Sequence, residues 1–278
     1  MNPYQVKQIN AHTWQIAEVY HLPAALPMYL VVGSARAALI DTGMGLGKLR
    51  ETIAGITPLP VSVFNTHAHI DHAAGNNEFD RVFMHPLEIP GARGGFPIEQ
   101  RLEFIELKCM YDPETEPLLQ YARKYIQPYQ TDYPIEPVND GERVDLGGVT
   151  LEAIHVPGHT AGSIVYLDRA GKNAFCGDAV NPRSSIAMFP GSPTVSDYCA
   201  SLERFLSLTE DIERYYVGHR LYAFGRDDVK DVLQCAREIV DGAMGEPYPM
   251  VVSRRGPIWG RIHWYNGKRI TFRAEHVK

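Results

Sequence analysis

The stretch that most constrains the fold is residues 61–75, VSVFNTHAHIDHAAG, where a dense group of polar side chains follows an apolar run. The run VSVF predicts a buried strand, and the small residues AAG predict the start of a helix. The potential metal ligands between them are His67, His69, Asp71 and His72. Because neutral imidazole and carboxylate are usual ligands of Zn²⁺ and similar divalent ions, this spacing predicts a metal site, and its layout suits two ions better than one.

The alternative is an ordinary polar loop. A single loop histidine is more often solvated or hydrogen-bonded than bound to a metal. Three histidines and an aspartate at this spacing, directly after a strand, are hard to explain in that way. The rest of the chain therefore tests whether further ligands follow.

Composition narrows the class of protein. The 278 residues suffice for one large domain or two small ones, and 45% hydrophobic with 22% charged residues is typical of a globular protein. The formal net charge of −6 argues against a nucleic-acid binder that relies on a basic surface. A small anionic substrate stays compatible, since metal ions supply local positive charge.

The cysteines and the N-terminus bear on location. Cys109, Cys176, Cys199 and Cys235 form no CxxC pair, so neither a disulfide framework nor a structural zinc site is indicated. The polar start MNPYQVKQINAHTW does not resemble a signal peptide, and no apolar run approaches the length of a membrane span. We therefore expect a cytoplasmic protein without membrane contact.

The first part of the chain predicts sheet. Strands are expected at 4–9, 13–20, 28–32 and 37–40, the last two joined by a turn at Gly33-Ser34. Asp41-Thr42-Gly43 then leads into a glycine-rich loop and a helix near 46–55. The spacing GMGLG lacks the remaining features of a phosphate-binding fingerprint, so it is only a weak indication of nucleotide binding.

Residues 91–140 differ from their surroundings, because they are rich in tyrosine, proline and glycine. Helices are expected at 98–110 and 116–127. We interpret the segment as an insertion that forms a lid or one wall of the ligand pocket. The alternatives are a helical hairpin that only covers hydrophobic surface, or one that makes a homodimer contact.

The second half returns to strands that end in polar side chains. The strand before Pro157-Gly158-His159-Thr160 follows a Gly147-Gly148 turn, and two further strands are expected at 163–167 and 173–176. The latter ends at Asp178, and a strand at 215–217 ends at His219.

Two helices and a hairpin complete the prediction. Ser196 is the expected N-cap of a helix over 196–208, and a second amphipathic helix covers 227–240. The tail predicts a hairpin at about 258–274 around Asn266-Gly267.

The motif HAHIDH resembles the HxHxDH signature of the metallo-β-lactamase superfamily of hydrolases. A PGHT-like loop with His159, then Asp178 and His219, follow in the order that this family shows. The resemblance covers about residues 13–225. It implies one domain over 1–278 with an αββα sandwich, in which two mixed β-sheets are flanked by helices and the ligand loops meet at one edge.

The resemblance also implies a ligand set. The first metal is expected at His67, His69 and His159, and the second at Asp71, His72 and His219, with Asp178 bridging both. Two divalent ions are expected, zinc first, with iron or manganese as alternatives. By the same resemblance Asp41 braces the metal loop through hydrogen bonds, whereas a reading from the residues alone makes it a helix N-cap or turn residue.

Some lactamase members have Cys or Ser where this chain has Asp178, so a bridging aspartate resembles the glyoxalase II and lactonase branch. The expected activity is attack of metal-bound hydroxide on a small ester, lactone or thioester. Asp71 would orient the water and transfer its proton, and Tyr222 is a candidate donor to the oxyanion.

Other functions on the same fold remain open. They are a phosphodiesterase or ribonuclease-type hydrolase, a β-lactamase, a mono-iron sulfur dioxygenase, and a non-catalytic binder with a structural metal. The expected partner is a small-molecule substrate, with no nucleic acid.

Overall fold

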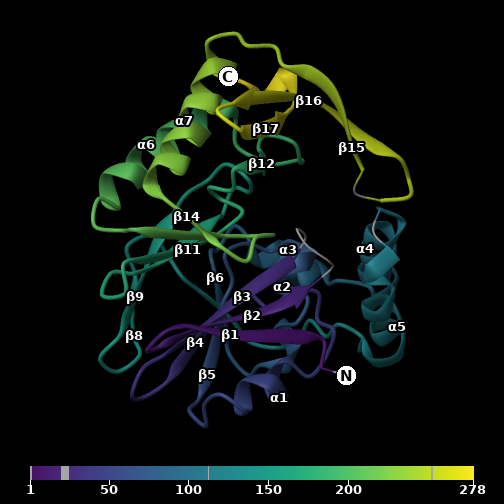
Figure 1. The fold of residues 1–278 in the computed structure, drawn as a ribbon, viewed down its shortest axis with the longest axis vertical. Coiled ribbons are helices and arrows are strands. Elements are labelled where there is room, and N and C mark those ends of the chain that lie inside the picture. Colours follow the sequence, from purple (N-terminus) through teal and green to yellow (C-terminus); the bar gives the residue numbers. More distant parts are fainter. Residues whose placement is uncertain (1, 20–24, 112, 252) are drawn as a thin grey trace.

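The computed structural model describes residues 2–19, 25–111, 113–251 and 253–278, and it folds two β-sheets face to face with helices outside (Figure 1). This confirms the predicted αββα sandwich. The predicted end of the second strand at Tyr20, and the neighbouring His21, lie outside the described residues.

The first sheet has the strand order β1 to β7. Its strands are β1 (Tyr4–Asn10), β2 (Thr13–Val19), β3 (Ala25–Val32), β4 (Ala37–Ile40), β5 (Val61–Phe64), β6 (Val82–Met84) and β7 (Ile135–Pro137). Strands β1 to β4 pair antiparallel, and β4 to β7 pair parallel. The segment that leaves this sheet lies between the end of β6 at Met84 and the start of β7 at Ile135, so the last residues of the predicted 91–140 belong to the sheet and its boundaries are shifted.

The second sheet has the order β14-β13-β11-β10-β9-β8. Its strands are β8 (Arg143–Asp145), β9 (Thr150–His155), β10 (Ile164–Asp168), β11 (Asn173–Gly177), β13 (Arg214–Val217) and β14 (Ala223–Phe224). Strands β9 and β11 both pair antiparallel with β10, and β13 pairs parallel with β11. These three strands therefore run in one direction, so the loops that follow them leave the sheet at the same edge.

A third sheet was not predicted as such. It has the order β12-β17-β16-β15, with β12 (Arg183–Ser185), β15 (Glu246–Val251), β16 (Pro257–Tyr265) and β17 (Lys268–Phe272). The expected tail hairpin corresponds to β16 and β17, joined at Asn266-Gly267. Strand β15 was not predicted, because its sequence EPYPMV carries two prolines. A strand tolerates proline at the edge of a sheet, which is the position of β15.

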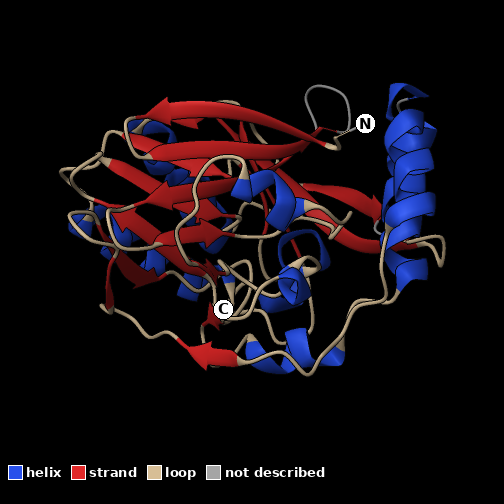
Figure 2. Ribbon diagram, turned by 90° about the horizontal axis from the view of Figure 1, so that it is seen from below, coloured by secondary structure: helices blue, strands red, loops and turns tan. Residues whose placement is uncertain are grey.

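The helices cover the outer faces of the sandwich and one side of it (Figure 2). They are α1 (Leu49–Ala54), α2 (Ile70–Ala73), α3 (Ile89–Gly94), α4 (Ile98–Tyr111), α5 (Glu116–Tyr125), α6 (Val195–Leu208) and α7 (Arg226–Val240), with short 3₁₀ turns at Asn76–Glu78, Pro113–Thr115 and Ala274–His276. Helices α4 and α5 confirm the two helices predicted for the inserted segment. Among the described residues, no helix combines the length and apolar character needed to cross a membrane.

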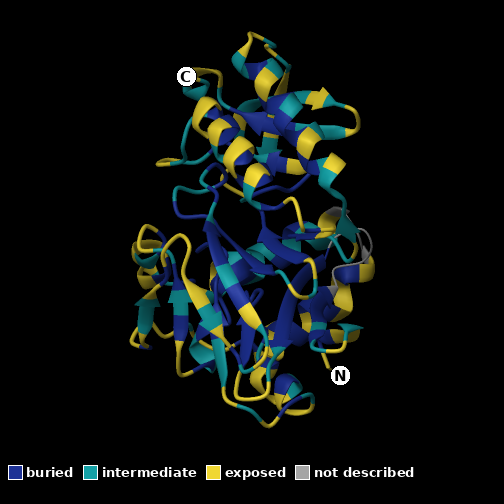
Figure 3. Ribbon diagram, turned by 90° about the vertical axis from the view of Figure 1, so that its left-hand side faces the viewer, coloured by how far each residue is buried: buried dark blue, intermediate teal, exposed yellow. Residues whose placement is uncertain are grey.

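The strands at the centre of the molecule consist mainly of buried residues (Figure 3). Between the two sheets, Tyr29 of β3 packs on Phe175 of β11 with ring centroids 5.0 Å apart, and Phe64 meets Tyr166 at 5.7 Å. A second cluster joins the first sheet to α1 and α3, and a third joins the second sheet to α6 and α7. Strands β3, β4, β10 and β11 are buried along nearly their whole length, because both of their faces are covered.

Two predicted helix starts are wrong. The glycine-rich loop delays α1 to Leu49, because Gly43, Gly45 and Gly47 all adopt positive φ, of 64°, 65° and 83°. Helix α2 begins at Ile70, so Asp71 and His72 lie inside it, whereas the small residues after them were predicted to start it.

The N-cap of α6 is Thr194, not the predicted Ser196. The Thr194 hydroxyl accepts the N–H of Asp197 at 3.1 Å, and the Asp197 carboxylate accepts the N–H of Thr194 at 3.0 Å. This is a capping box, which satisfies two otherwise unpaired donors. The Ser196 side chain is exposed in the first turn, where it has no such role.

We predict that Thr194→Ala lowers the free energy of unfolding by about 1 kcal/mol, because the cap of α6 is lost. The matched substitution Ser196→Ala should change it by less than about 0.5 kcal/mol. Urea denaturation of both variants measures the difference. Equal losses, or a larger loss at Ser196, would mean that the capping box does not stabilise the helix.

Candidate metal centre

Five of the seven predicted ligands lie in loops that follow strands, and Asp71 and His72 lie in helix α2. The loop after β5 and the first turn of α2 carry His67, His69, Asp71 and His72. The other three follow the parallel-running strands of the second sheet, with His159 after β9, Asp178 after β11 and His219 after β13. Rigid elements on both sides of each loop hold these side chains in place.

Three overlapping groups of these side chains could each hold a metal ion, since the ligand atoms within a group lie within 4.8 Å of one another. The groups are His67, His69 and His159; His67, His72 and Asp178; and Asp71, His72 and His219. The first and third correspond to the two expected ligand sets, and the second joins Asp178 to a histidine from each.

Asp178 lies among members of both sets. Its Oδ2 is 3.1 Å from Nε2 of His219, 3.6 Å from Nε2 of His159 and 3.9 Å from Nε2 of His72. Nε2 of His159 lies 3.0 Å from Nδ1 of His69. One carboxylate oxygen of Asp178 therefore lies within 4 Å of imidazole nitrogens from both expected ligand sets.

Two buried imidazole nitrogens lack a hydrogen-bond partner among the described residues, namely Nε2 of His67 and Nε2 of His72. The other nitrogen of each ring is engaged. Nδ1 of His67 is 3.1 Å from the Thr66 hydroxyl, and Nδ1 of His72 is 2.8 Å from a carboxylate oxygen of Asp41. Since an unpartnered buried nitrogen is unfavourable, this arrangement fits metal ligation through Nε2.

The pKa values of these side chains also favour metal binding. Burial, followed by neighbouring imidazoles, lowers the pKa of His67 well below its usual value and that of His69 to about 3. Burial would also lower the pKa of His72, but the carboxylates, Asp41 first, outweigh it and raise that pKa to about 10. Burial would raise the pKa of Asp178, yet nearby histidines, His219 first, hold it well below its usual value. Neutral imidazoles and an ionised carboxylate are the states that bind metals, and binding at His72 would release a proton.

Asp41 braces the loop after β5. One carboxylate oxygen accepts the backbone N–H of Thr66 at 2.7 Å, and the other accepts the Thr66 hydroxyl at 2.8 Å as well as contacting His72. Asp41 is not the N-cap of α1, which is Lys48. Asp41 and His219 both have φ of 62°, in the left-handed region that non-glycine residues rarely adopt, and such strain is found preferentially at functional sites.

Sequence reasoning missed two further bracing residues. Glu88 is only 6% exposed, and its two carboxylate oxygens accept the N–H groups of Ala68 and Gly162, each at 2.8 Å. Asn181 donates to Oδ1 of Asp178 at 3.3 Å and to the carbonyl of Gly218 at 2.9 Å. Its i+3 spacing from Asp178 could have indicated a role, whereas no local pattern indicates that Glu88 is buried.

A cavity of about 540 Å³ opens onto the cluster. Five of the seven expected ligands line it, namely His69, Asp71, His159, Asp178 and His219. Its apolar lining is Ile70, Phe104, Phe189 and Met250, and its cations are Lys108, Arg183, Arg220 and Arg269. Phe104 and Lys108 come from α4, so the inserted segment supplies part of the wall.

The structure does not bring Tyr222 to this cavity. Its side chain is 58% exposed and packs on Phe224, with ring centroids 5.1 Å apart. A second hollow of about 550 Å³, near Arg50 and Asp80, is lined by no histidine or cysteine among the described residues. The predicted metal ligands therefore lie at the first cavity and not at the second.

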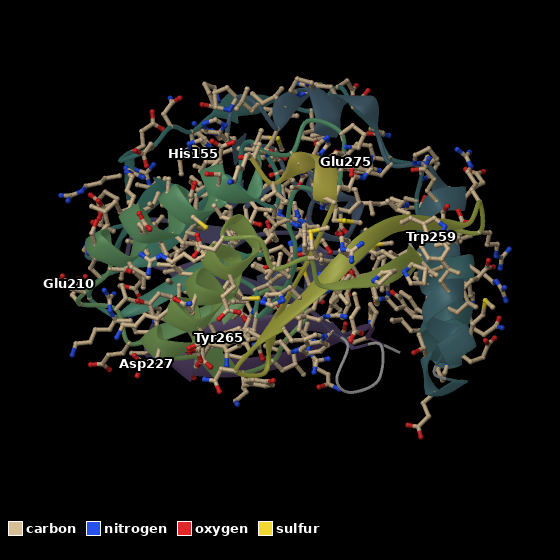
Figure 4. The ribbon with its side chains drawn as sticks, turned by 90° about the horizontal axis from the view of Figure 1, so that it is seen from above. His155, Glu210, Asp227, Trp259, Tyr265 and Glu275 are labelled. Atoms are coloured by element: carbon tan, nitrogen blue, oxygen red, sulfur yellow. The ribbon has the colours of Figure 1, made fainter. Side chains whose placement is uncertain are left out.

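The C-terminal sheet reaches over to the inserted helices. Arg254, in the turn after β15, pairs with Glu106 of α4 at 2.7 Å, and its backbone N–H donates to Glu103 at 2.6 Å. Trp259 of β16 lies on the part of the sheet that extends toward α4 (Figure 4). Both segments contribute to the cavity, since Met250 belongs to β15 and Phe104 to α4.

Comparison with known proteins places these observations in a family. Residues 27–240 match the family described as the metallo-beta-lactamase superfamily. The acyl-coenzyme A thioesterase MBLAC2 of Homo sapiens is 31% identical over 206 residues, which are 69% of this chain and 72% of that protein. A hydroxyacylglutathione hydrolase of Aeromonas hydrophila is 24% identical over 200 residues, which are 70% of this chain and 64% of that protein.

Solved structures agree on the fold. A metallo-beta-lactamase from Pontibacter korlensis superimposes with a TM-score of 0.59 at 17% identity, covering 84% of this chain and 99% of that one. A metallo-beta-lactamase family protein from Thermus thermophilus gives a TM-score of 0.59 at 18% identity, with 86% and 85% covered. At this identity the likeness concerns the fold alone.

Proposed function

We propose, because this chain belongs to the metallo-β-lactamase superfamily, that it hydrolyses small thioesters or related esters at a dinuclear metal centre. The observation that carries the proposal is the convergence of seven ligand side chains, from loops far apart in sequence, beside one cavity. The thioesterase and hydroxyacylglutathione hydrolase among the relatives support a thioester as the substrate.

We assign one ion to His67, His69 and His159 and the other to Asp71, His72 and His219, with Asp178 contacting both. When bound there, two divalent ions, zinc first, would supply Lewis acidity that lowers the pKa of water to about neutral and polarises a substrate carbonyl. Asp178 would offset the repulsion between two such cations, and Asp41 holds the His72 ring in the orientation that presents Nε2.

Asp71 is assigned the proton transfer. It lines the cavity, and its Oδ2 lies 3.6 Å from Nε2 of His219. Its pKa is lowered although burial acts to raise it, because His72 and His219 stabilise the carboxylate, so it is ionised and can accept a proton. Hydrolysis adds water across the thioester, which releases a carboxylic acid and a thiol, and Asp71 would pass the proton to the departing sulfur.

The apolar wall is assigned to the acyl group. Ile70, Phe104, Phe189 and Met250 lie along the cavity that the ligands line. Phe189 is in edge contact with the His69 ring, with centroids 5.2 Å apart, so the apolar surface extends to the cluster itself. An acyl chain bound there would place its carbonyl next to the ligands, which is the positioning that hydrolysis requires.

We predict that Phe104→Ala raises KM for thioesters with acyl chains of about eight carbons by about 5- to 150-fold, since roughly 1–3 kcal/mol of apolar contact is lost. Metal content should not change, because Phe104 is not among the ligands. Met110→Ala is the matched control, since Met110 lies on the same helix but is 71% exposed and does not line the cavity. An unchanged KM in Phe104→Ala would place the acyl group elsewhere.

A substrate panel tests the proposed reaction. Zinc-loaded protein is assayed with chromogenic esters, thioesters, lactones, a β-lactam and bis-phosphate esters. We expect the highest kcat/KM with the thioesters or esters. Activity confined to the phosphate esters or to the β-lactam would refute the proposal, and one iron per chain with oxygen consumption would indicate a dioxygenase instead.

A phosphodiester substrate is the second candidate, and one observation favours it. Although the chain has a formal net charge of −6, Lys108, Arg183, Arg220 and Arg269 all line the cavity, which makes it locally basic. Such a lining suits an anionic substrate. The phosphate esters in the panel decide between the two candidates.

The remaining assignments are proposals of the same kind. We propose a single catalytic domain in which α4 and α5 form a pocket wall. A cytoplasmic location and a homodimer stay predictions, which size-exclusion chromatography with light scattering and microscopy of a tagged chain would test.

A further inference from the structure

Four cationic side chains line the cavity together with the metal ligands. They come from four separate parts of the fold, with Lys108 on α4, Arg183 on β12, Arg220 in the loop between β13 and β14, and Arg269 on β17. Because the chain as a whole is acidic, this concentration is local and needs its own explanation.

Arg183 and Arg269 are direct neighbours across the parallel pair of β12 and β17. Like charges opposite each other in a sheet are destabilising, and no carboxylate lies within ion-pair distance of either guanidinium in the part of the chain that the structure describes. The charge of the adjacent Lys268, by contrast, is balanced by a carboxylate, since Lys268 pairs with Asp228 at 2.8 Å. Places where a local rule is broken without compensation tend to be functional.

The Arg269 side chain is also held in position. Its guanidinium lies over the rings of Tyr248 and Trp264, at 5.5 and 5.8 Å from their centroids, and its Nε is buried without a hydrogen-bond partner among the described residues. Arg220 is anchored through a hydrogen bond of 2.7 Å from its Nη1 to the carbonyl of His219. Both groups are therefore ordered while donors remain available to a ligand.

We propose that Arg183, Arg220 and Arg269 bind a phosphate group on the thiol portion of the substrate. This rests on the thioester hydrolysis proposed above and specifies the leaving group as a phosphorylated thiol. Guanidinium forks match phosphate and carboxylate oxygens, and three of them beside Lys108 supply more charge than a single carboxylate would balance. The apolar wall then receives the acyl group, and the two parts of the substrate meet at the metal ligands.

The test compares thioesters that share one acyl group and differ only in the thiol. The probes are the octanoyl thioesters of coenzyme A, which carries phosphates, of glutathione, which carries carboxylates, and of N-acetylcysteamine, which is neutral. For Arg183→Gln and Arg269→Gln we expect KM for the coenzyme A thioester to rise about 10- to 100-fold, the loss typical of one charge-assisted contact. KM for the N-acetylcysteamine thioester should stay within about two-fold of wild type.

Arg255→Gln is the matched control, because Arg255 is exposed in the turn after β15 and does not line the cavity. All variants should keep the wild-type metal content. Arg183 is exposed, so its substitution leaves the core intact. Equal effects on all three thioesters, or an effect confined to the glutathione thioester, would overturn the phosphate assignment.

A binding measurement separates this inference from the proposed reaction. Free coenzyme A is titrated calorimetrically into the metal-loaded wild type and variants. If no thioester is hydrolysed, the proposed reaction is refuted. Binding of coenzyme A that is 10- to 100-fold weaker in Arg269→Gln than in wild type would still support the phosphate site. Equal Kd values in wild type, Arg183→Gln and Arg269→Gln would refute the site whatever the activity.

Discussion

Asp178→Asn is expected to lose most of its bound metal and to lower kcat/KM by on the order of 10³-fold or more, at least the loss seen when one preorganised electrostatic contact is removed from an active site. The reason is geometric, since one Asp178 oxygen lies within 4 Å of His72, His159 and His219, which belong to both ligand sets. An amide oxygen is neutral and would not offset the repulsion between two cations. Metal analysis of the purified variant and its kinetics with a thioester measure both effects.

Asp145→Asn provides the control, because Asp145 is an exposed residue of β8 that does not line the cavity, and its carboxylate accepts the N–H of Gly147 within its turn. It should keep wild-type metal content and activity. A fully active Asp178→Asn variant would show that the carboxylate does not hold the ions. A variant with full metal content but no activity would limit Asp178 to the chemistry.

Gly218→Ala is expected to impair the centre without removing any ligand. A methyl group at Gly218 would overlap Oδ1 of Asp178 and lie 3.2 Å from Cε1 of His72. Both side chains are held by other contacts, so one of them must move. Loss of a group that orients a metal ligand typically lowers metal affinity or activity by about 10- to 100-fold, and we expect displacement of a ligand to cost at least as much. Competition with a chromogenic zinc chelator, together with kcat/KM, measures the loss.

Gly94→Ala is the matched substitution, since a methyl group at that position meets no atom within 4 Å. The melting temperature of each variant shows whether Gly218→Ala acts on the site or on the whole fold. Wild-type zinc affinity in Gly218→Ala would mean that Asp178 and His72 tolerate the displacement, and it would weaken the assignment of both as ligands.

The sequence predicted the features that depend on local pattern. Each ligand follows a short apolar run that ends in a polar or glycine residue, and such strand ends can be recognised without knowing which strands pair. The order of His67, His159, Asp178 and His219 along the chain was therefore visible, and so was the division of strands between two sheets. The structure brings these side chains together because β9, β11 and β13 run in one direction.

Features that depend on distant pairing were not predictable. Arg183 and Arg269 become neighbours only through the parallel pairing of β12 with β17, and the three residues of β12 carry no strand pattern. Glu88 lies in an unremarkable LEIP sequence, and its burial results from contacts with Ala68 and Gly162. Tyr222 was predicted as a donor because it follows His219 closely in sequence. Its side chain is nevertheless exposed and does not line the cavity.

The central claim is that residues from separate loops hold a pair of ions beside the cavity, and anomalous X-ray diffraction from crystals of the full chain grown with zinc tests it most directly. Two anomalous peaks are expected, one bounded by His67, His69 and His159 and the other by Asp71, His72 and His219, with Asp178 between them. Absence of any peak at these side chains after saturation with zinc, manganese and iron in turn would contradict it.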